Sequence, residues 1–318
     1  MRVLFIIDPI TSLKAYKDSS VAMMYACHDR GHQVFITEQP DLYIQGQVFA
    51  RVQAIQLLDE VDLHSNNWWQ YEGESQDMNL ADFDAVIMRK DPPFDMEYAY
   101  SCHLLAYAEK FGAKVFNSGS AMLAHPEKLA ITEFSQFTAP TLVSRDMERI
   151  KAFYREHGEV VVKPLDGMGG MGIFRLSSHE PNLNAILEML TRNGQETIMA
   201  QRYIPDIVKG DKRILIINGE PVPYCLARIP LAGETRGNLA AGGRGVAQPL
   251  SERDWEIARA LAPTLKARGL FVVGLDVIGD YLTEVNVTSP TCFVEITTQT
   301  DFHVSQFFVE QLEKVVGA

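Results

Sequence analysis

A glycine-rich loop that follows a lysine near the middle of the chain has the residue types needed to hold a phosphate. The segment "KPLDGMGGMGIFR", from Lys163 to Arg175, comes directly after the apolar run "EVVV". Gly167, Gly169 and Gly172 match the G-x-G-x-x-G dinucleotide fingerprint, but that fingerprint requires a helix immediately afterwards, and "IFRL" predicts a strand. We therefore expect a hairpin whose tip exposes backbone N–H groups to an anion; the alternative is a flexible surface turn that binds nothing.

Two lysines are candidates for contact with phosphate oxygens, because an ammonium group is a compact positive charge. Lys163 closes an apolar run, where a solvated lysine is not expected, and Lys128 lies in the segment "PEKLAITEFSQF". Either lysine taken alone also fits an ordinary surface residue. Lys163 is the stronger candidate of the two.

The segment "GLDVIGDYLTEVNVTSP" predicts a hairpin that could hold a hard metal ion. Asp276, Glu284 and Asn286 alternate with an apolar set that we expect in the core: Leu275, Val277, Thr283, Val285 and Val287. A three-residue connection, Gly279 to Tyr281, places Asp276 opposite Glu284, whereas a two-residue turn would put them on opposite faces. Two carboxylates and an amide oxygen on one face suit Mg²⁺. A solvated polar face is the alternative.

A long loop, "RIPLAGETRGNLAAGGRG", is expected from residue 228 to residue 245. Loops of this length without secondary structure are usually lids or disordered insertions. Arginine forms bidentate contacts with carboxylates and phosphates, so Arg228, Arg236 and Arg244 predict closure over anionic substrates.

The first third of the chain alternates strand and helix, which predicts a small parallel sheet with right-handed crossovers. Strands are expected near residues 3–8, 32–37, 84–90 and 113–117, and helices near 18–31 and 97–112. The loops "IDPITSLKAYKDSS" and "MRKDPPFD" follow two of these strands, where ligands of parallel sheets bind. Ordinary connecting loops are the alternative.

After about residue 124 the pattern changes to helices and strands joined by short turns, which predicts antiparallel sheets. Helices are expected near residues 126–137, 147–158, 182–194 and 252–269, with a kink at Pro263. The strands between them include the two hairpins described above.

Composition limits the classes of function. The chain has 318 residues, 47% of them hydrophobic, and a formal net charge of -12. That length predicts two or three compact units, and that charge argues against nucleic-acid or anionic-membrane partners. Four cysteines without a C-x-x-C pair, together with no apolar run of signal-peptide or transmembrane length, predict a soluble cytoplasmic enzyme with reduced thiols.

The glycine-rich hairpin that could bind phosphate, the hairpin that could hold a metal ion and the arginine-rich loop, all on one chain, indicate phosphoryl transfer from ATP. The segments "KPLDGMGGMGIFR", "DKRILIINGEPVPYCLARIP", "ETRGNLAAGGRG" and "GLDVIGDYLTEVNVTSPT" resemble the prokaryotic glutathione synthetase family of the ATP-grasp superfamily. "DPITSLKAYKDSS" and "MRKDPPFD" resemble its amino-terminal part, so the resemblance covers almost the whole chain.

The resemblance implies an α/β (α+β) architecture. It implies an ATP-grasp fold with two antiparallel-sheet subdomains around ATP, residues 124–204 and 205–318, after an N-terminal parallel α/β domain, residues 1–123. It also implies a homotetrameric ligase that joins γ-glutamylcysteine to glycine through an acyl phosphate, giving glutathione, ADP and phosphate.

The resemblance further implies roles for individual residues. Asp276, Glu284 and Asn286 would bind two Mg²⁺ ions, with Mn²⁺ as a possible substitute, and Arg213, Arg228 and Arg236 would face the reacting groups. ATP would be bound by Lys128, Lys163, Asp166, Gly167, Gly169, Gly170, Gly172, Gln201, Arg202, Tyr203, Ile204 and Asp211. The other substrates would be bound by Asp18, Ser19, Arg89, Asn238, Arg244 and Ser289.

Two rival functions share many of these features. One is another ATP-grasp ligase, acting for example on D-alanine or glutamate, and the other is a non-catalytic ATP-binding module. The "MRKDPPFD" segment and the arginine-rich loop favour glutathione synthesis over the first. The metal hairpin together with that loop argues against the second.

Overall fold

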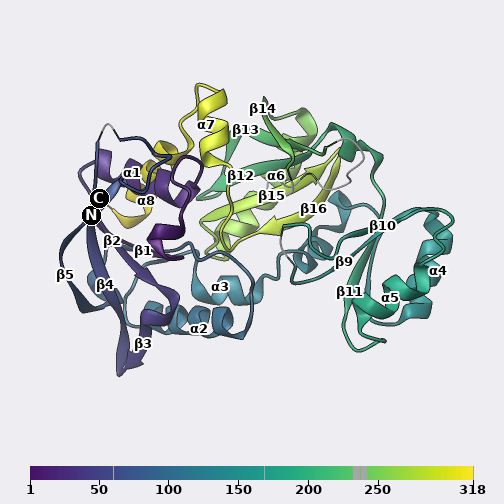
Figure 1. The fold of residues 1–318 in the computed structure, drawn as a ribbon, viewed down its shortest axis with the longest axis horizontal. Coiled ribbons are helices and arrows are strands. Elements are labelled where there is room, and N and C mark those ends of the chain that lie inside the picture. The colour runs from purple at the N-terminus through teal and green to yellow at the C-terminus, as the bar shows by residue number, and fades with distance from the viewer. Residues whose placement is uncertain (60, 168, 232–236, 238–241, 318) are drawn as a thin grey trace.

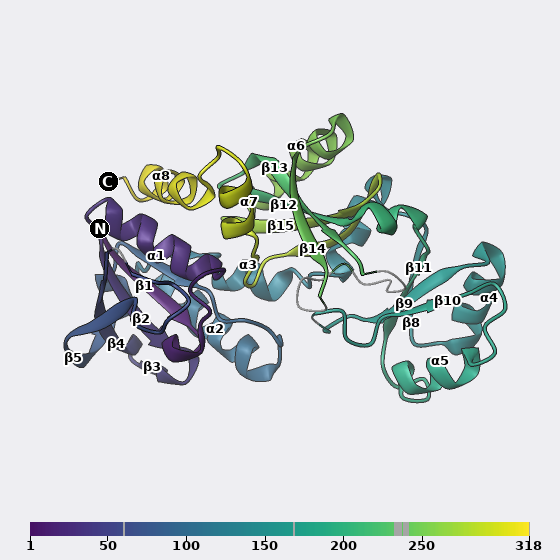
Figure 2. The ribbon, with the colours of Figure 1, turned by 45° about the horizontal axis from the view of Figure 1, so that its top comes forward.

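The computed structural model describes residues 1–59, 61–167, 169–231, 237 and 242–317. Within these residues, three β-sheets follow one another along the long axis of the molecule, and helices cover them (Figures 1 and 2). The sheet built from the C-terminal part of the chain lies between the other two. None of the described helices is long and apolar enough to cross a membrane.

The N-terminal sheet is built around the buried strand β1 (Arg2–Ile7). This strand pairs in parallel with β2 (Gln33–Glu38) and β6 (Ala85–Met88), and β6 pairs in parallel with β7 (Val115–Phe116). Alternate side chains of β1 enter two different cores, one shared with α1 (Ser19–Asp29) and the other with α2 (Met96–Lys110). A strand buried on both faces explains the continuous apolar run "VLFII".

The four strands expected in the N-terminal sheet pair in parallel, as predicted, but three strands that were not expected add an antiparallel edge. There β4 (Gln47–Leu57) pairs antiparallel with β2, β3 (Leu42–Gln45) and β5 (Trp69–Asn79). Gly46, at φ 75°, makes the tight turn between β3 and β4. The N-terminal sheet is therefore mixed.

The sheet built from the middle of the chain, which we call the central sheet, has the order β10-β9-β11-β8. Its strands pair antiparallel, as expected. The glycine loop joins β9 (Val160–Pro164) to β10 (Phe174–Leu176), which confirms the hairpin. The other two strands and the two helices packed on this sheet are β8 (Thr141–Ser144), β11 (Ile198–Arg202), α4 (Met147–His157) and α5 (Leu183–Thr191).

The C-terminal sheet has the order β14-β13-β12-β15-β16 and is also antiparallel. Its strands are β12 (Asp211–Ile217), β13 (Glu220–Ile229), β14 (Arg244–Pro249), β15 (Val272–Ile278) and β16 (Tyr281–Asn286). The helix α6 (Glu252–Ala267) packs on one face of the sheet and continues through Pro263. The helix expected near residues 126–137 is a 3₁₀ helix, Leu129–Phe137, interrupted at Phe134.

The short helix α3 (Gly119–Ala124) follows β7 and leads into the segment that carries Lys128. The last two helices, α7 (Phe293–Gln299) and α8 (Val304–Val316), return to the N-terminal part of the molecule. Phe293 and Phe308 share a core with residues of β1 and α1. The chain segment just before α7 therefore connects the C-terminal sheet to the N-terminal sheet.

Candidate active site

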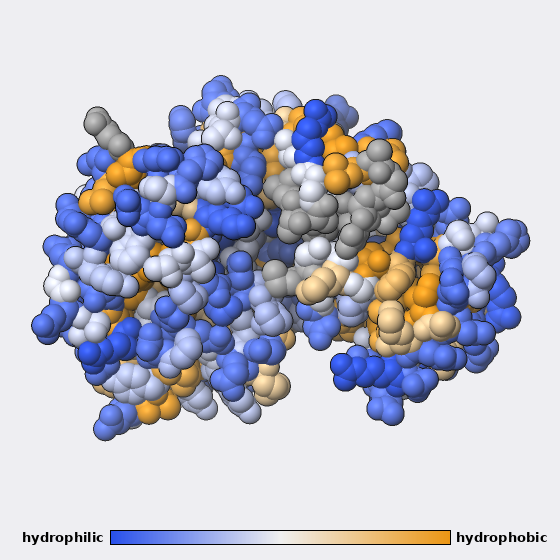
Figure 3. Space-filling model, viewed as in Figure 1, coloured by the Kyte–Doolittle hydropathy of each residue, from blue (hydrophilic) through white to orange (hydrophobic). Residues whose placement is uncertain are grey.

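A cleft of about 350 Å³ lies between the central and C-terminal sheets. The molecular surface is indented where the part built on the central sheet meets the rest of the molecule (Figure 3). Residues from β9, β11, β12, β13, β15 and β16 line this cleft, and the glycine loop and residues 127–128 also reach it. Both hairpins singled out in the sequence therefore face the same space.

Lys128 and Lys163 both line this cleft and come from different segments of the chain. Lys163, on β9, is buried, and its Nζ donates to the carbonyl oxygen of Thr283 at 3.3 Å. Burial lowers the pKa of Lys163, and the Glu284 carboxylate partly opposes that effect. The Nζ of Lys128 lies 3.1 Å from Glu284 Oε1 and also donates to the Gly167 carbonyl oxygen. Lys128 thus links the glycine loop to the expected metal hairpin.

The expected metal hairpin has the predicted register but not the predicted turn. Ile278 pairs with Tyr281, so the connection has two residues rather than three. A β-bulge farther along the hairpin, where Thr283 is the extra residue, restores Asp276 to its place opposite Glu284. The statement that a two-residue turn separates the two carboxylates is wrong, because the bulge changes the parity of the strand.

The bulge also changes where Thr283 lies. The alternating pattern placed Thr283 in the core, but the core position belongs to Leu282, and Thr283 lines the cleft. The Thr283 hydroxyl donates to the Asp276 backbone oxygen at 3.1 Å, and its own carbonyl oxygen accepts from Lys163. Leu275, Val277, Val285 and Val287 are in the core, as expected.

Asp276 is held between two buried arginines. Arg213 donates to its carboxylate through Nε at 2.6 Å and through Nη2 at 3.1 Å, and Arg228 Nη2 lies 3.0 Å from it. Burial alone would raise the pKa of Asp276, but the two guanidinium groups outweigh burial and hold that pKa well below its usual range. Asp276 is therefore ionised.

Asp211 lies on the other side of Arg228, 2.7 Å from its Nη2. Burial raises the pKa of Asp211 to about 6, against the opposing effect of Arg228. Its Oδ1 atom is buried without a hydrogen-bond partner among the described residues. An acceptor of this kind next to the cleft suits a hydroxyl or amine donor from a ligand.

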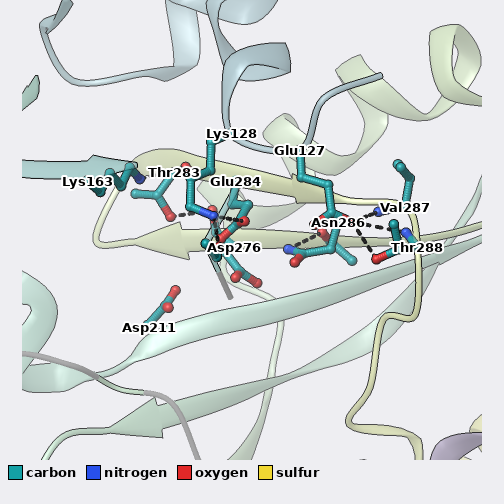
Figure 4. A network of polar contacts seen from close by, with 12 residues as sticks. Glu127, Lys128, Lys163, Asp211, Asp276, Thr283, Glu284, Asn286, Val287 and Thr288 are labelled. Carbon is teal, nitrogen blue, oxygen red and sulfur yellow. Dashed lines mark hydrogen bonds and ion pairs between the residues drawn. The ribbon is translucent and has the colours of Figure 1, made fainter. Parts of the chain in front are cut away.

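Sequence reasoning missed Glu127, which precedes Lys128 and lines the cleft. Its Oε1 accepts from the backbone N–H of Val287 at 2.8 Å and from the N–H and Oγ1 of Thr288 at 3.0 and 2.9 Å (Figure 4). Burial raises the pKa of Glu127, and the nearby Glu284 carboxylate raises it further. The only signal in the sequence was its place beside a candidate phosphate ligand.

The far end of the cleft combines apolar side chains with the strand end of β11. Val161, Ile173, Ile204 and Ile278 line it, and sequence reasoning named only Ile204. Tyr203 lies beneath the Arg175 guanidinium, 3.9 Å from ring centroid to Cζ. A flat aromatic ring could lie between these apolar groups, because they come from both sheets.

Comparison with known proteins decides the family. The family models for the prokaryotic glutathione synthetase N-terminal domain and ATP-grasp domain match residues 1–122 and 127–301. A glutathione synthetase of Bordetella parapertussis is 68% identical over 318 residues, all of both chains. One from Neisseria meningitidis serogroup A is 58% identical over 98% of each chain. The chain belongs to the prokaryotic glutathione synthetase family.

Solved structures show the same fold at low sequence identity. The D-cycloserine synthetase DcsG matches with a TM-score of 0.66 at 16% identity, over 99% of each chain. The ATP-grasp ligase PsnB, in a complex with a minimal precursor, Mg and ADP, matches with a TM-score of 0.63 at 16% identity, over 99% of this chain and 98% of that one. The ATP-grasp fold and the enzyme class, an ATP-dependent ligase of the glutathione synthetase family, are thereby confirmed.

Most residues implied by the family resemblance lie together in the cleft. Those that line it are Lys128, Lys163, Gly167, Gly169, Gly170, Gln201, Arg202, Tyr203, Ile204, Asp211, Arg213, Arg228, Asp276, Glu284, Asn286 and Ser289. Asp166 and Gly172 belong to the glycine loop but are not among the lining residues. Arg236 and Asn238 lie outside the described residues.

The loop expected from residue 228 to residue 245 is shorter than predicted. Arg228 is a buried residue inside β13, and Arg244 is the first residue of β14, where it is exposed. The two strands pair through Ile229 and Arg244. Arg228 is therefore fixed by the sheet, and assigning it to a flexible lid was wrong.

Three of the implied substrate residues, Asp18, Ser19 and Arg89, do not line the cleft but form a structural group next to Ser289, which does. Arg89 is buried and donates to Ser20 Oγ at 2.9 Å and to the Pro290 carbonyl oxygen at 3.0 Å. Ser289 Oγ donates to the Arg89 carbonyl oxygen at 3.3 Å. Asp18 accepts from the first turn of α1, and Ser19 Oγ accepts from the Phe293 N–H at 3.3 Å. These contacts hold the segment before α7 against the N-terminal sheet.

The oxygen atoms on the hairpin fit a magnesium ion whose other ligands would be phosphate oxygens and water. The described residues contain no group of three or more His, Cys, Asp or Glu side chains that could hold a metal. Asp276 and Glu284 supply two carboxylates, and Asn286 Nδ2 donates to the Gly274 carbonyl oxygen at 3.1 Å, which leaves its Oδ1 as a further ligand. Mg²⁺ is commonly bound by one or two carboxylates, substrate phosphates and water, so this set is sufficient.

Proposed function

We propose that this chain joins γ-glutamylcysteine to glycine, with ATP converted to ADP and phosphate, and so makes glutathione. The observation that carries the proposal is the convergence of Lys128, Lys163, Asp276 and Glu284 on one cleft of a glutathione synthetase family member. The ligases of known structure that share the fold include one with Mg and ADP.

The reaction that we propose has two steps. The cysteinyl carboxylate attacks the γ-phosphorus of ATP, the bond to the β-phosphate oxygen breaks, and an acyl phosphate and ADP result. The amine of glycine then attacks the acyl carbon, phosphate leaves, and the amine loses a proton. Neither step needs a protein nucleophile, because alignment and charge neutralisation supply the rate enhancement.

The residues of the cleft have separate tasks in this proposal. Lys128 and Lys163 bind phosphate oxygens, the glycine loop covers them through backbone N–H groups, and residues 201–204 receive the adenine ring. Arg213 and Arg228, with Arg236 as a further candidate, face the carboxylate and the transferred phosphoryl group. Asp276, Glu284 and Asn286 would hold two Mg²⁺ ions. When bound, the metal neutralises charge on the phosphate oxygens.

Exclusion of water is the second requirement, because an acyl phosphate is readily hydrolysed. We assign that task to the glycine loop and to the residues between β13 and β14. Asp18, Ser19, Arg89 and Ser289 support the face of the cleft on which we place the dipeptide. Asn238 and Arg244 remain candidates for contact with the same substrate.

The organisation of the chain forms a separate part of the proposal. We infer an N-terminal unit (residues 1–123), a central unit (124–204) and a C-terminal unit (205–318), in a cytoplasmic homotetramer. Limited proteolysis would test the boundaries, and light scattering would test the assembly.

One assay tests the activity. Phosphate release from ATP should be slow with γ-glutamylcysteine or glycine alone and fast with both, and mass spectrometry should find one tripeptide for each phosphate. Release that depends on D-alanine or glutamate instead would indicate a different ATP-grasp ligase. No release with any acid and amine, despite ATP binding, would indicate a non-catalytic module.

A further inference from the structure

Glu127 connects the backbone around the expected metal hairpin to the lysine beside it. Its carbonyl oxygen accepts from the Val285 N–H at 3.0 Å, and its side chain accepts from Val287 and Thr288. Because β16 is the last strand of its sheet, these bonds occupy an edge that has no strand partner in the part of the chain that the structure describes. The next residue, Lys128, contacts Glu284 on the same strand. Figure 4 shows the two side chains reaching β16 next to one another.

Glu127 and Lys128 contact β16 and the residues just after it, at and next to the side chains that we propose as metal ligands. Lys128 meets Glu284, and Glu127 holds the residues immediately after Asn286. A shift of residues 287 and 288 would therefore move Asn286, whose amide is held by one bond to Gly274. Through Lys128, the same two-residue segment also contacts the glycine loop.

The hydrogen bonds of Glu127 do not by themselves explain why residue 127 is a carboxylate. The three donors could be satisfied by an uncharged amide, and a negative charge beside Glu284 opposes folding through repulsion. A negative charge next to a cation site strengthens cation binding, and the residues that orient metal ligands are commonly charged acceptors. Glu127 therefore combines a structural hydrogen-bond pattern with a charge that a bound cation would use.

We infer that Glu127 is a positioning residue for Mg²⁺–nucleotide binding, acting through residues 286–288 and Lys128. The inference rests on the proposed function of the cleft as a site for ATP with Mg²⁺. The hydrogen bonds of Glu127 hold the backbone next to the proposed metal ligand Asn286, and its negative charge favours binding of the cation. Loss of the contact should weaken the affinity for Mg²⁺ more than it weakens the fold.

The test uses the full chain and measures the Mg²⁺ concentration that half-saturates ADP binding, by calorimetry without the acid or amine substrate. Loss of such an orienting contact typically lowers metal affinity about 10- to 100-fold. We expect Glu127→Ala to raise the half-saturating Mg²⁺ concentration by about 10-fold or more. Glu127→Gln keeps an acceptor for the three donors but removes the charge, so it should give a smaller increase, about threefold, intermediate between wild type and alanine.

Two controls separate positioning from stability and from general charge. Glu133→Gln removes the same charge from an exposed ion pair with Arg268 and should leave the Mg²⁺ dependence unchanged. Tyr154→Phe removes a hydroxyl that bonds the Ser177 carbonyl oxygen in the central part of the chain, so it lowers stability far from the hairpin. It should lower the melting temperature without shifting the Mg²⁺ dependence.

A half-saturating Mg²⁺ concentration for Glu127→Ala within twofold of wild type would overturn the inference, as would an equal shift in Tyr154→Phe. If Glu127→Ala does not fold, Glu127→Gln and Thr288→Val decide, and no shift in either would overturn it. The calorimetry needs no product, so a wild-type chain that binds Mg²⁺ and ADP but makes no tripeptide would refute the proposed function and not this inference.

Discussion

Replacement of Lys163 by methionine should separate nucleotide binding from folding. The ammonium group is buried at the end of β9, and among the described residues its one hydrogen bond is a long one, 3.3 Å, to the Thr283 carbonyl oxygen. Burial lowers its pKa, so the folded chain without nucleotide already disfavours the charge. Methionine keeps most of the volume and removes the charge.

The magnitudes follow from this environment. Removing a charged hydrogen-bond donor costs about 1.5–3 kcal/mol where the partner is itself charged, so the Kd for ATP should rise about 10- to 150-fold. Folding loses one weak bond and gains relief from a desolvated charge, so the free energy of unfolding should change by about 1 kcal/mol or less. Binding and stability should therefore respond to very different extents.

Isothermal calorimetry with ATP and Mg²⁺ measures the first quantity, and urea denaturation measures the second. Lys209→Met is the matched control, because Lys209 is exposed and pairs with Asp206 outside the cleft. That control should bind ATP as the wild type does. An unchanged Kd in folded Lys163→Met would refute the phosphate role of Lys163, and a loss of several kcal/mol in stability would refute the reasoning about burial.

Three further predictions use the hairpin and a buried histidine. Asp276→Asn leaves Arg213 and Arg228 without their shared counter-charge, so urea denaturation should show a loss of about 3–5 kcal/mol. Glu284→Gln should change stability by about 1 kcal/mol or less but abolish the extra rise in melting temperature that Mg²⁺ with ATP gives over ATP alone; an unchanged rise would contradict a metal role. Burial, with Arg268 nearby, lowers the pKa of His125 from 6.5 to about 4. The unfolded chain then binds more protons between these values, so stability should fall by up to about 3 kcal/mol as the pH drops from 6.5 to 4, and His125→Gln should flatten that slope in pH-dependent denaturation.

The alternation of residue types was sufficient to place the three candidate metal ligands of the hairpin on one face. Asp276, Glu284 and Asn286 had to share a face because a slip by one residue would send two carboxylates into the apolar core. The turn could not be predicted, since a two-residue turn with a one-residue bulge has the same parity as a three-residue turn. The composition of "IGDYLT" is compatible with both, and only the packing of Leu282 in place of Thr283 distinguishes them.

The antiparallel edge of the N-terminal sheet could have been predicted in part. In the segment "LYIQGQVFARVQAIQL", Gly46 separates two short runs, and apolar residues alternate with polar ones from Ala50 to Gln53, a pattern typical of a strand with one solvated face. The continuous apolar run of β1 is typical of a buried parallel strand and is easily recognised in a sequence. An edge hairpin is more polar, so its sequence pattern is weaker, and only the central strands of this sheet were predicted.

The arginine contacts to Asp276 depend on strand order, which local patterns do not specify. Arg213 is opposite Asp276 only because β12 lies between β13 and β15, and Arg228 reaches it from β13. The same order makes the roles of these residues interdependent. In the structure the arginines neutralise Asp276, whereas the proposed reaction needs Asp276 for Mg²⁺ and the arginines for phosphate and carboxylate. If Asp276 holds Mg²⁺ and the arginines hold phosphate, as we propose, binding of Mg²⁺ and ATP together would give Asp276 and the arginines new counter-charges at the same time. Either partner alone would leave buried charges unpaired, which is a physical reason for this cleft to favour the metal–nucleotide complex over its separate components.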